Sequence, residues 1–114
     1  MRHYLGLTPP DDARGCLQDI HWSGGAIGYF PTYTLGNMYA AQFFERIRTD
    51  LGDVDAQFRR GDFLPLLEWL RTNIHRHGKR YTARDLVRKV TGADLNAEPL
   101  MRHLRGRASE FYGV

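Results

Sequence analysis

Apolar residues recur at helical spacing along most of the sequence, and this pattern is the strongest constraint on its fold. The longest run lies between Pro31 and Gly52. Pro31 can open a helix because a first-turn N–H needs no partner, and Gly52 suits the left-handed residue that often ends one. The residues spaced for one side of this helix are Leu35, Met38, Tyr39, Gln42, Phe43 and Ile47. No stretch of useful length alternates apolar with polar residues as a strand does, so the sequence predicts an all-α fold.

Shorter helices, separated by glycine and proline, are predicted for the rest of the chain. We expect them at 11–18, 62–77, 82–92 and 96–111, with a short linking helix or turn at 53–60. Asp62 and Asn96 are the expected N-caps of two of these helices, and Thr82 with Asp85 resembles a capping box at a third. A chain of 114 residues forms one domain at most, so we expect a single domain over 1–114, a compact array of about five helices.

One glycine-rich stretch, residues 15–37, gathers the most chemically able side chains. Its polar and aromatic members include Gln18, Asp19, His21, Trp22, Tyr29 and Tyr33. The glycines between them allow positive φ and close backbone approach at an entropic cost that a purely structural segment usually avoids. Considered by itself, a single histidine such as His21 is more often a hydrogen-bonded structural residue than part of a site.

The order of residues in this stretch closely resembles that of the carboxypeptidase Taq-type zinc metallocarboxypeptidases. The matching motifs are Gly15-x-x-Gln18-Asp19-x-His21-Trp22 and Gly28-Tyr29-Phe30-Pro31-Thr32-Tyr33-x-Leu35-Gly36-Asn37. In that family the block lies near the C-terminal end of the enzyme. The resemblance therefore implies the C-terminal part of a larger helical metallopeptidase fold, with an active-site wall and a long helix in 1–53 and a basic helical segment in 54–114. It also implies an activity, the zinc-dependent or cobalt-dependent removal of C-terminal residues from peptides by attack of water.

The metal-binding motif of that family, H-E-x-x-H followed by a downstream Glu, does not occur in the sequence. The histidines are His3, His21, His75, His77 and His103. We therefore expect no metal site in this chain and no activity from the chain alone. Zinc or cobalt is implied only for the complete enzyme, together with a peptide substrate and an upstream polypeptide that carries H-E-x-x-H.

The same resemblance implies that His21 and one of two tyrosines line the cleft opposite the metal. His21, Tyr29 and Tyr33 are the candidate catalytic residues, because neutral N–H and O–H groups can donate to the oxyanion of a tetrahedral intermediate. The sequence leaves the choice of tyrosine open, with a slight preference for Tyr29 because it follows Gly28. Asp19 could orient His21 or an arginine elsewhere. The candidate substrate-binding residues are Gln18, Asp19 and Trp22.

Several other residues with chemical potential have simpler interpretations. His75 and His77 are two residues apart, which suits no common metal site, so we expect a solvated helix end. Cys16 has no positioned base in the sequence, and we expect no catalytic role for it. Trp22 and Trp69 are also interpreted as core residues, as large apolar side chains usually are.

Charge is distributed unevenly along the chain. Residues 1–53 contain four Lys or Arg against six Asp or Glu, and residues 54–114 contain twelve against seven, for a formal net charge of +3. A basic half could bind nucleic acid, so the alternative function is a non-catalytic helical interaction module or a nucleic-acid-binding module. The cations are interspersed with acids and apolar residues, however, so we favour solvated helix surfaces and expect no nucleic-acid partner.

Cysteine usage and hydropathy suggest where the protein works. A single cysteine, Cys16, fits a reducing cytoplasm, and no apolar run approaches the ~20 residues of a membrane span. If most of a parent enzyme is missing, surface that it would cover is exposed, and exposed apolar surface drives association. We therefore expect a homodimer or higher oligomer, with the region from Trp22 to Phe30 near the contact.

Overall fold

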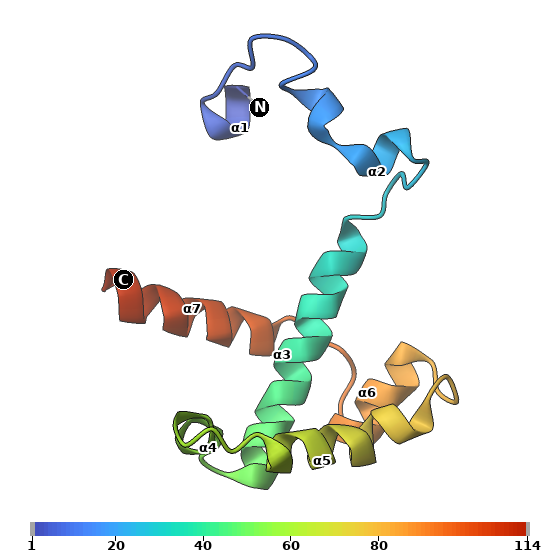
Figure 1. The fold of residues 1–114 in the computed structure, drawn as a ribbon, viewed down its shortest axis with the longest axis vertical. Helices are drawn as coiled ribbons and strands as arrows, with labels where there is room; N and C mark the ends of the chain where they lie inside the picture. Colours follow the sequence, from blue (N-terminus) through green and yellow to red (C-terminus); the bar gives the residue numbers. More distant parts are fainter. Residues whose placement is uncertain (1, 114) are drawn as a thin grey trace. The chain divides into compact units, whose positions relative to one another are not determined.

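The computed structural model describes residues 2–113, and every regular element in that range is a helix (Figure 1). The predicted all-α fold is therefore confirmed. In chain order the elements are α1 (Arg2–Leu5), the 3-10 helix η1 (Cys16–Gln18), α2 (Ile20–Ser23), α3 (Pro31–Leu51), α4 (Val54–Arg59), α5 (Leu64–Asn73), the 3-10 helix η2 (His75–His77), α6 (Ala83–Thr91) and α7 (Glu98–Tyr112). None of the helices described has the length and apolar character needed to cross a membrane.

The chain divides into two compact units, Met1–Tyr33 and Thr34–Val114. The division falls in the first turn of α3, well before the change of composition near residue 53. The prediction of one domain over 1–114 stays a prediction.

The long helix α3 has the bounds that its sequence predicts. It begins at Pro31 and ends at Leu51, and Gly52 follows with φ 74°. The Gly52 N–H donates to the Arg48 carbonyl at 3.0 Å, which closes the last turn. Only a residue free of Cβ strain adopts this left-handed conformation cheaply, so the glycine fixes where the helix stops.

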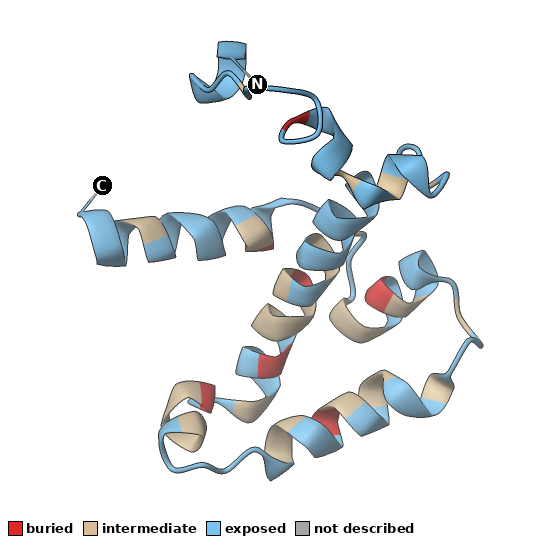
Figure 2. Ribbon diagram, turned by 45° about the horizontal axis from the view of Figure 1, so that its top comes forward, coloured by how far each residue is buried: buried red, intermediate tan, exposed pale blue. Residues whose placement is uncertain are grey.

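The second unit contains a small hydrophobic core where α3, α4 and α5 meet. Its buried members are Ile47, Val54 and Trp69, and partly buried apolar side chains from α3 to α6 pack around them. Figure 2 colours buried positions red along the ribbon. Trp69 is 8% exposed, so its predicted place in the core is confirmed. Its indole N–H donates to Asp50 Oδ2 at 2.8 Å, which satisfies the one polar atom that this side chain carries inward.

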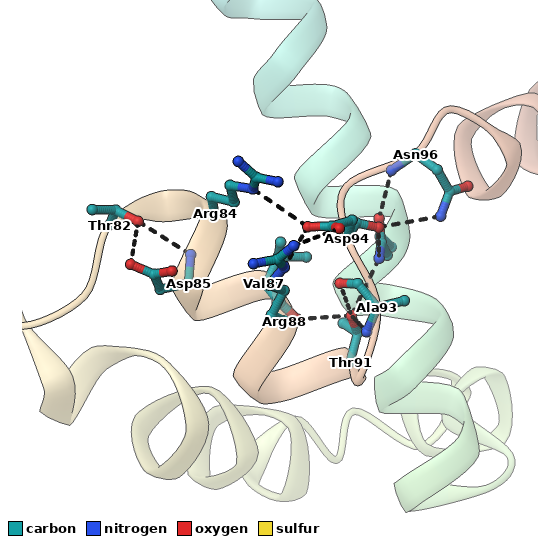
Figure 3. Close-up of polar contacts among 10 residues, drawn as sticks. Thr82, Arg84, Asp85, Val87, Arg88, Thr91, Ala93, Asp94 and Asn96 are labelled. Atoms are coloured by element: carbon teal, nitrogen blue, oxygen red, sulfur yellow. Dashed lines mark hydrogen bonds and ion pairs between the residues drawn. The ribbon is translucent and has the colours of Figure 1, made fainter.

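A second anchor of this unit is polar and joins α3 to the loop between α6 and α7. Gln42 is 5% exposed, and its amide nitrogen donates to the Asp94 carbonyl at 3.0 Å and to Thr91 Oγ1 at 3.2 Å. Its amide oxygen accepts from the Asn96 N–H at 3.1 Å. Figure 3 shows how the loop folds back on α6 through Arg88 and Asp94 around this point. The buried amide is thus fully used, as a buried polar group must be.

The N-caps predicted for three helices can be compared with the structure. Thr82 caps α6 by accepting from the Asp85 N–H at 3.2 Å, as predicted. Asn96 Oδ1 accepts from the Glu98 N–H at 3.0 Å, although the N-cap position of α7 itself is Ala97. The prediction for Asp62 is wrong, because α5 begins one residue later than a cap there requires and Phe63 holds the N-cap without a side-chain bond.

The helix predicted at 11–18 is also wrong, since this segment contains only turns and the three-residue η1. Gly15 explains the difference. Its backbone has φ −118° and ψ −114°, and a Cβ placed on it would lie 3.1 Å from Pro9 Cβ and 3.2 Å from the Asp11 carbonyl oxygen. The chain approaches itself too closely at Gly15 for a regular helix or a larger side chain.

Candidate functional site

Asp19 sets up the site by capping the single-turn helix α2. Its Oδ2 accepts from the Trp22 N–H at 2.9 Å, and its Oδ1 accepts from the His21 N–H at 3.2 Å. These bonds use two of the four N–H groups that a helix leaves free at its start. They also hold the carboxylate directly beside the side chain of His21.

The imidazole of His21 lies between a carboxylate and a phenol. Its Nδ1 is 2.9 Å from Asp19 Oδ1, and its Nε2 is 3.2 Å from the Tyr33 hydroxyl oxygen. Asp19 therefore makes the contact that is expected if it orients His21, and its role stays a prediction. Asp19, His21 and Tyr33 form one continuous hydrogen-bonded chain, which we name the Asp19–His21–Tyr33 chain.

Aromatic rings surround this imidazole. Tyr29 stacks on it with ring centroids 5.7 Å apart and planes inclined by 18°, and Phe30 lies at 4.8 Å. Tyr33 meets it edge-on at 88° and meets Tyr29 at 84°, with centroids 6.1 and 5.2 Å apart. Stacked and edge-to-face arrangements of this kind are the preferred geometries of aromatic pairs. They fix the ring plane of His21 from the side that its hydrogen bonds leave free.

The backbone between His21 and Tyr33 brings the two side chains together. Gly25 and Gly28 have φ 81° and 74°, so the chain reverses after α2 at positions where only glycine is unstrained. The Ala26 N–H donates to the His21 carbonyl at 2.7 Å and closes this turn. Since α3 begins at Pro31, Tyr33 lies in its first turn, whereas Tyr29 lies before it.

The electrostatics of the site are dominated by Asp19. The Trp22 N–H is the largest cause that lowers the pKa of the Asp19 carboxyl below its ordinary value, and the ring and N–H of His21 lower it further. Burial acts in the opposite direction but does not prevail. Asp19 is therefore an anion at neutral pH and can only accept hydrogen bonds there.

Gln18 and Trp22 do not join this chain of hydrogen bonds. The Gln18 amide nitrogen donates to the Ala13 carbonyl at 2.5 Å, within its own turn. Trp22 is 63% exposed, so its interpretation as a core residue is wrong. The reason is that the neighbouring turns of this unit bring no apolar surface over the indole. The roles of Gln18 and Trp22 in substrate binding stay predictions.

One residue of the site was missed by the sequence analysis. Phe30 is the ring closest to His21, with centroids 4.8 Å apart, yet it is not among the predicted site residues. Its position between Tyr29 and the helix-opening Pro31 was the available signal, because this segment is the densest aromatic run in the chain.

The side chains present do not fit a metal ion. Across residues 2–113, no three His, Cys, Asp or Glu side chains are grouped so that they could hold one. The Asp19–His21–Tyr33 chain offers one carboxylate and one imidazole, and both are engaged with each other. Its chemistry is that of hydrogen-bond donation and proton placement.

Comparison with known proteins, rather than the side chains themselves, places the chain in a family of metallopeptidases. The chain belongs to the carboxypeptidase Taq (M32) metallopeptidase family, whose model matches residues 1–108. Among its relatives, thermostable carboxypeptidase 1 of Thermus thermophilus is 47% identical over 112 residues, which are 98% of this chain and 22% of the relative. Carboxypeptidase 1 of Bacillus subtilis is 47% identical over 109 residues, 96% of this chain and 22% of the relative.

Solved structures give the same assignment. The crystal structure of an M32 carboxypeptidase from Deinococcus radiodurans matches with a TM-score of 0.90 and 44% identity, covering 99% of this chain and 23% of that one. Trypanosoma cruzi metallocarboxypeptidase 1 matches with a TM-score of 0.84 and 47% identity over 94% of this chain and 23% of its own. The resemblance seen in the two motifs is confirmed, and the chain spans less than a quarter of the length of these relatives.

Proposed function

We propose that this chain is the C-terminal portion of a metal-dependent carboxypeptidase and forms part of the wall of its peptide-binding cleft. The observation that carries the proposal is the Asp19–His21–Tyr33 chain, in which Nδ1 and Nε2 of one imidazole are 2.9 and 3.2 Å from their partners. It is built from the residues that resemble the family motifs, and it places a histidine and a phenol together at the protein surface.

In peptide-bond hydrolysis, the attack of water on the carbonyl places negative charge on its oxygen. A positioned donor at that oxygen is worth roughly 10²- to 10³-fold in rate. The Tyr33 hydroxyl is the group of this chain that supplies such a donor, and His21 is its hydrogen-bond partner. The metal of the complete enzyme is held by residues outside 2–113, because neither H-E-x-x-H nor a suitable group of ligands is found within them.

The structure favours Tyr33 over Tyr29 as the donor, which reverses the slight preference from the sequence. The Tyr33 hydroxyl bonds to His21, and its position is fixed by the first turn of α3. Tyr29 instead presents its ring face to His21. Tyr33 is 50% exposed, so its hydroxyl can also reach a substrate.

Exposed apolar surface supports the proposal that this chain works in contact with other polypeptide. In the unit Met1–Tyr33, the large exposed apolar residues include Leu5, Leu7, Leu17, Ile20, Trp22, Ile27 and Phe30. We propose that a metal-bearing H-E-x-x-H polypeptide covers part of this surface, and that a second copy contacts the region from Trp22 to Phe30. Sedimentation of the chain alone at high concentration tests the second part, which a strictly monomeric profile would contradict.

Nucleic acid is a poorer partner for the basic half than its composition suggests. Four of its arginines pair with carboxylates at 2.8 Å or less, namely Arg71 with Glu68, Arg88 with Asp94, Arg102 with Glu45 and Arg107 with Glu110. One of its carboxylates, Asp55, pairs with Arg48 of α3 at 2.8 Å. A paired guanidinium has less charge to offer a phosphate. Retention on DNA or RNA that weakens with salt would support nucleic-acid binding instead.

The proposed setting is the cytoplasm, and the proposed metal of the complete enzyme is zinc or cobalt. The single cysteine supports a reducing compartment. The family assignment supports a metal but leaves its identity to experiment.

A chimera tests the proposed function directly. The matching segment of Bacillus subtilis carboxypeptidase 1 is replaced by this chain, which is 47% identical to it over 109 residues. We expect release of C-terminal amino acids from peptides, loss of this activity on chelation, and recovery with zinc or cobalt. The unsubstituted parent is the control for activity. An inactive chimera with the parent's size, helicity and metal content would contradict the proposal.

A further inference from the structure

The hydrogen bonds of His21 determine where its protons lie. Asp19 is an acceptor only, so the contact of 2.9 Å between its Oδ1 and Nδ1 of His21 requires a hydrogen on Nδ1. A neutral imidazole carries a single N–H, which leaves Nε2 as an acceptor. The contact of 3.2 Å at Nε2 is therefore a bond in which the Tyr33 hydroxyl donates.

This arrangement leaves no free donor on either side chain while His21 is neutral. The one ring hydrogen points at Asp19, and the one phenolic hydrogen points at His21. If Nε2 takes a proton from water, the ring has two N–H groups and the new one donates to the Tyr33 oxygen. The phenolic hydrogen then has no partner within the chain of hydrogen bonds and can turn outward.

We propose that Asp19 is a positioning residue that holds neutral His21 as the Nδ1–H tautomer, and that a proton added at Nε2 reverses the His21–Tyr33 bond and frees the Tyr33 hydroxyl for a substrate oxygen. The tautomer of His21 and the role of Asp19 do not depend on the proposed function, whereas the use of the Tyr33 hydroxyl for a substrate oxygen rests on it. In this step the N–H bond forms as an O–H bond of a solvent hydronium ion breaks and leaves water, and no other covalent bond changes.

The groups that face His21 are consistent with this role for Asp19. Asp19 lies at Nδ1, Tyr33 at Nε2 and Tyr29 on the ring face, and the fourth neighbour, Phe30, is uncharged. Elsewhere in the unit, the Arg14 side chain pairs with Asp11 at 3.4 Å. Asp19 is thus the one anion that contacts the ring among the described residues.

The tautomer can be measured on the full chain by long-range ¹H–¹⁵N correlation of the imidazole nitrogens in alkaline buffer, where histidines are neutral. His21→Gln assigns the resonances. We expect a protonated-type shift for Nδ1 and an unprotonated-type shift for Nε2. A protonated Nε2, or two averaged shifts, would overturn the proposal without any substituted variant having to fold.

Asp19→Ser keeps the N-cap of α2 but removes the contact with the His21 ring, because serine is a good N-cap residue whose side chain is too short to reach Nδ1. We expect His21 to lose the Nδ1–H tautomer in this variant and to keep it in Tyr33→Phe. Asp53→Ser is the matched control, since Asp53 caps α4 by accepting from the Ala56 N–H at 2.8 Å and contacts no imidazole. An unchanged tautomer in Asp19→Ser would overturn the role of Asp19.

The last part of the proposal is tested in the chimera. We expect Asp19→Ser to lower kcat by roughly 10- to 100-fold with little change in KM, as losses of residues that orient an active-site side chain do. The pH dependence of kcat should change as well, whereas Asp53→Ser should leave both unchanged. An unchanged kcat and pH profile would overturn this part alone, and an inactive unsubstituted chimera would instead contradict the proposed function.

Discussion

The two units of this chain differ in how far they bury the same kinds of residue. Trp69 in the second unit is 8% exposed and packs in a core, whereas Trp22 in the first is 63% exposed. In the described part of the first unit, Gly15 is the one residue that is buried, while the second unit buries Ile47, Val54 and Val87. The candidate site lies in the first unit, whose described residues include no buried apolar side chain.

This difference shows how each unit is held together. The second unit relies on apolar burial and on the buried amide of Gln42. The first relies on an N-cap, glycine turns and the rings stacked around His21. Hydrogen bonds between exposed groups contribute little net stability, because water competes for them. The first unit should therefore be the less stable of the two wherever no other polypeptide covers it.

The largest effect is expected from Trp69→Ala. Removing a buried tryptophan typically costs about 3–5 kcal/mol, through lost transfer free energy and the cavity left behind. We expect the urea midpoint of unfolding of the second unit, followed by helical circular dichroism, to be much lower than in the unsubstituted chain. The same substitution at Trp22 is the matched control, and equal effects at both positions would contradict the contrast between the units.

A smaller effect is expected from Gln42→Leu in the polar anchor of the second unit. The substitution leaves the Asn96 N–H and the Asp94 carbonyl without their buried partner, which costs about 1–3 kcal/mol. Urea titration measures this cost, and Gln18→Leu serves as the control at an exposed glutamine. A neutral Gln42→Leu would show that water replaces the amide and that the anchor contributes nothing.

Acid should weaken the second unit through its ion pairs. Arg46 and the Trp69 indole lower the pKa of Asp50 below 3.8, and Arg48 and Arg88 do the same for Asp55 and Asp94. These carboxyls therefore bind protons more readily in the unfolded chain than in the folded one. The stability that the ion pairs contribute is complete above pH 3.8 and is lost as the pH falls through that value and below. Thermal unfolding against pH should show a falling midpoint in acid that high salt flattens, because these pairs are partly exposed. A midpoint that is independent of pH in acid would contradict it.

The smallest effect is expected from Trp22→Ala. Substitutions at exposed positions usually change the free energy of unfolding by less than about 0.5 kcal/mol. Fluorescence sharpens the comparison, because an exposed indole emits at longer wavelength than a buried one. In the chain alone, diluted until it is monomeric, Trp22→Ala should remove the red-shifted emission and Trp69→Ala the blue-shifted emission. A blue-shifted Trp22 in the monomer would contradict the contrast between the units.

The sequence predicted those parts of the structure that depend on local signals. Pro31 and Gly52 set the bounds of α3 through their own φ preferences, and Asp19 lies close enough to His21 in the chain to reach its ring. It failed where distant parts of the chain decide the outcome. The approach of Pro9 to Gly15 prevents the helix at 11–18, and the exposure of Trp22 depends on what packs beside it.

The choice between the two tyrosines shows the same limit within the site. Tyr29 and Tyr33 are four residues apart and would share a face if a helix included both. The structure separates them because Gly28 has φ 74° and α3 begins at Pro31. The sequence predicts the start at Pro31, whereas the positive φ of Gly28 is not visible from residue spacing.

The central claim is tested most directly by comparing Tyr33→Phe with Tyr29→Phe in the chimera. Each change removes one hydroxyl and keeps the ring. We expect kcat to fall by roughly 10²- to 10³-fold for Tyr33→Phe, as for other oxyanion donors, and to stay near the unsubstituted value for Tyr29→Phe. A chimera whose kcat depends on Tyr29 instead, or on neither tyrosine, would contradict the account.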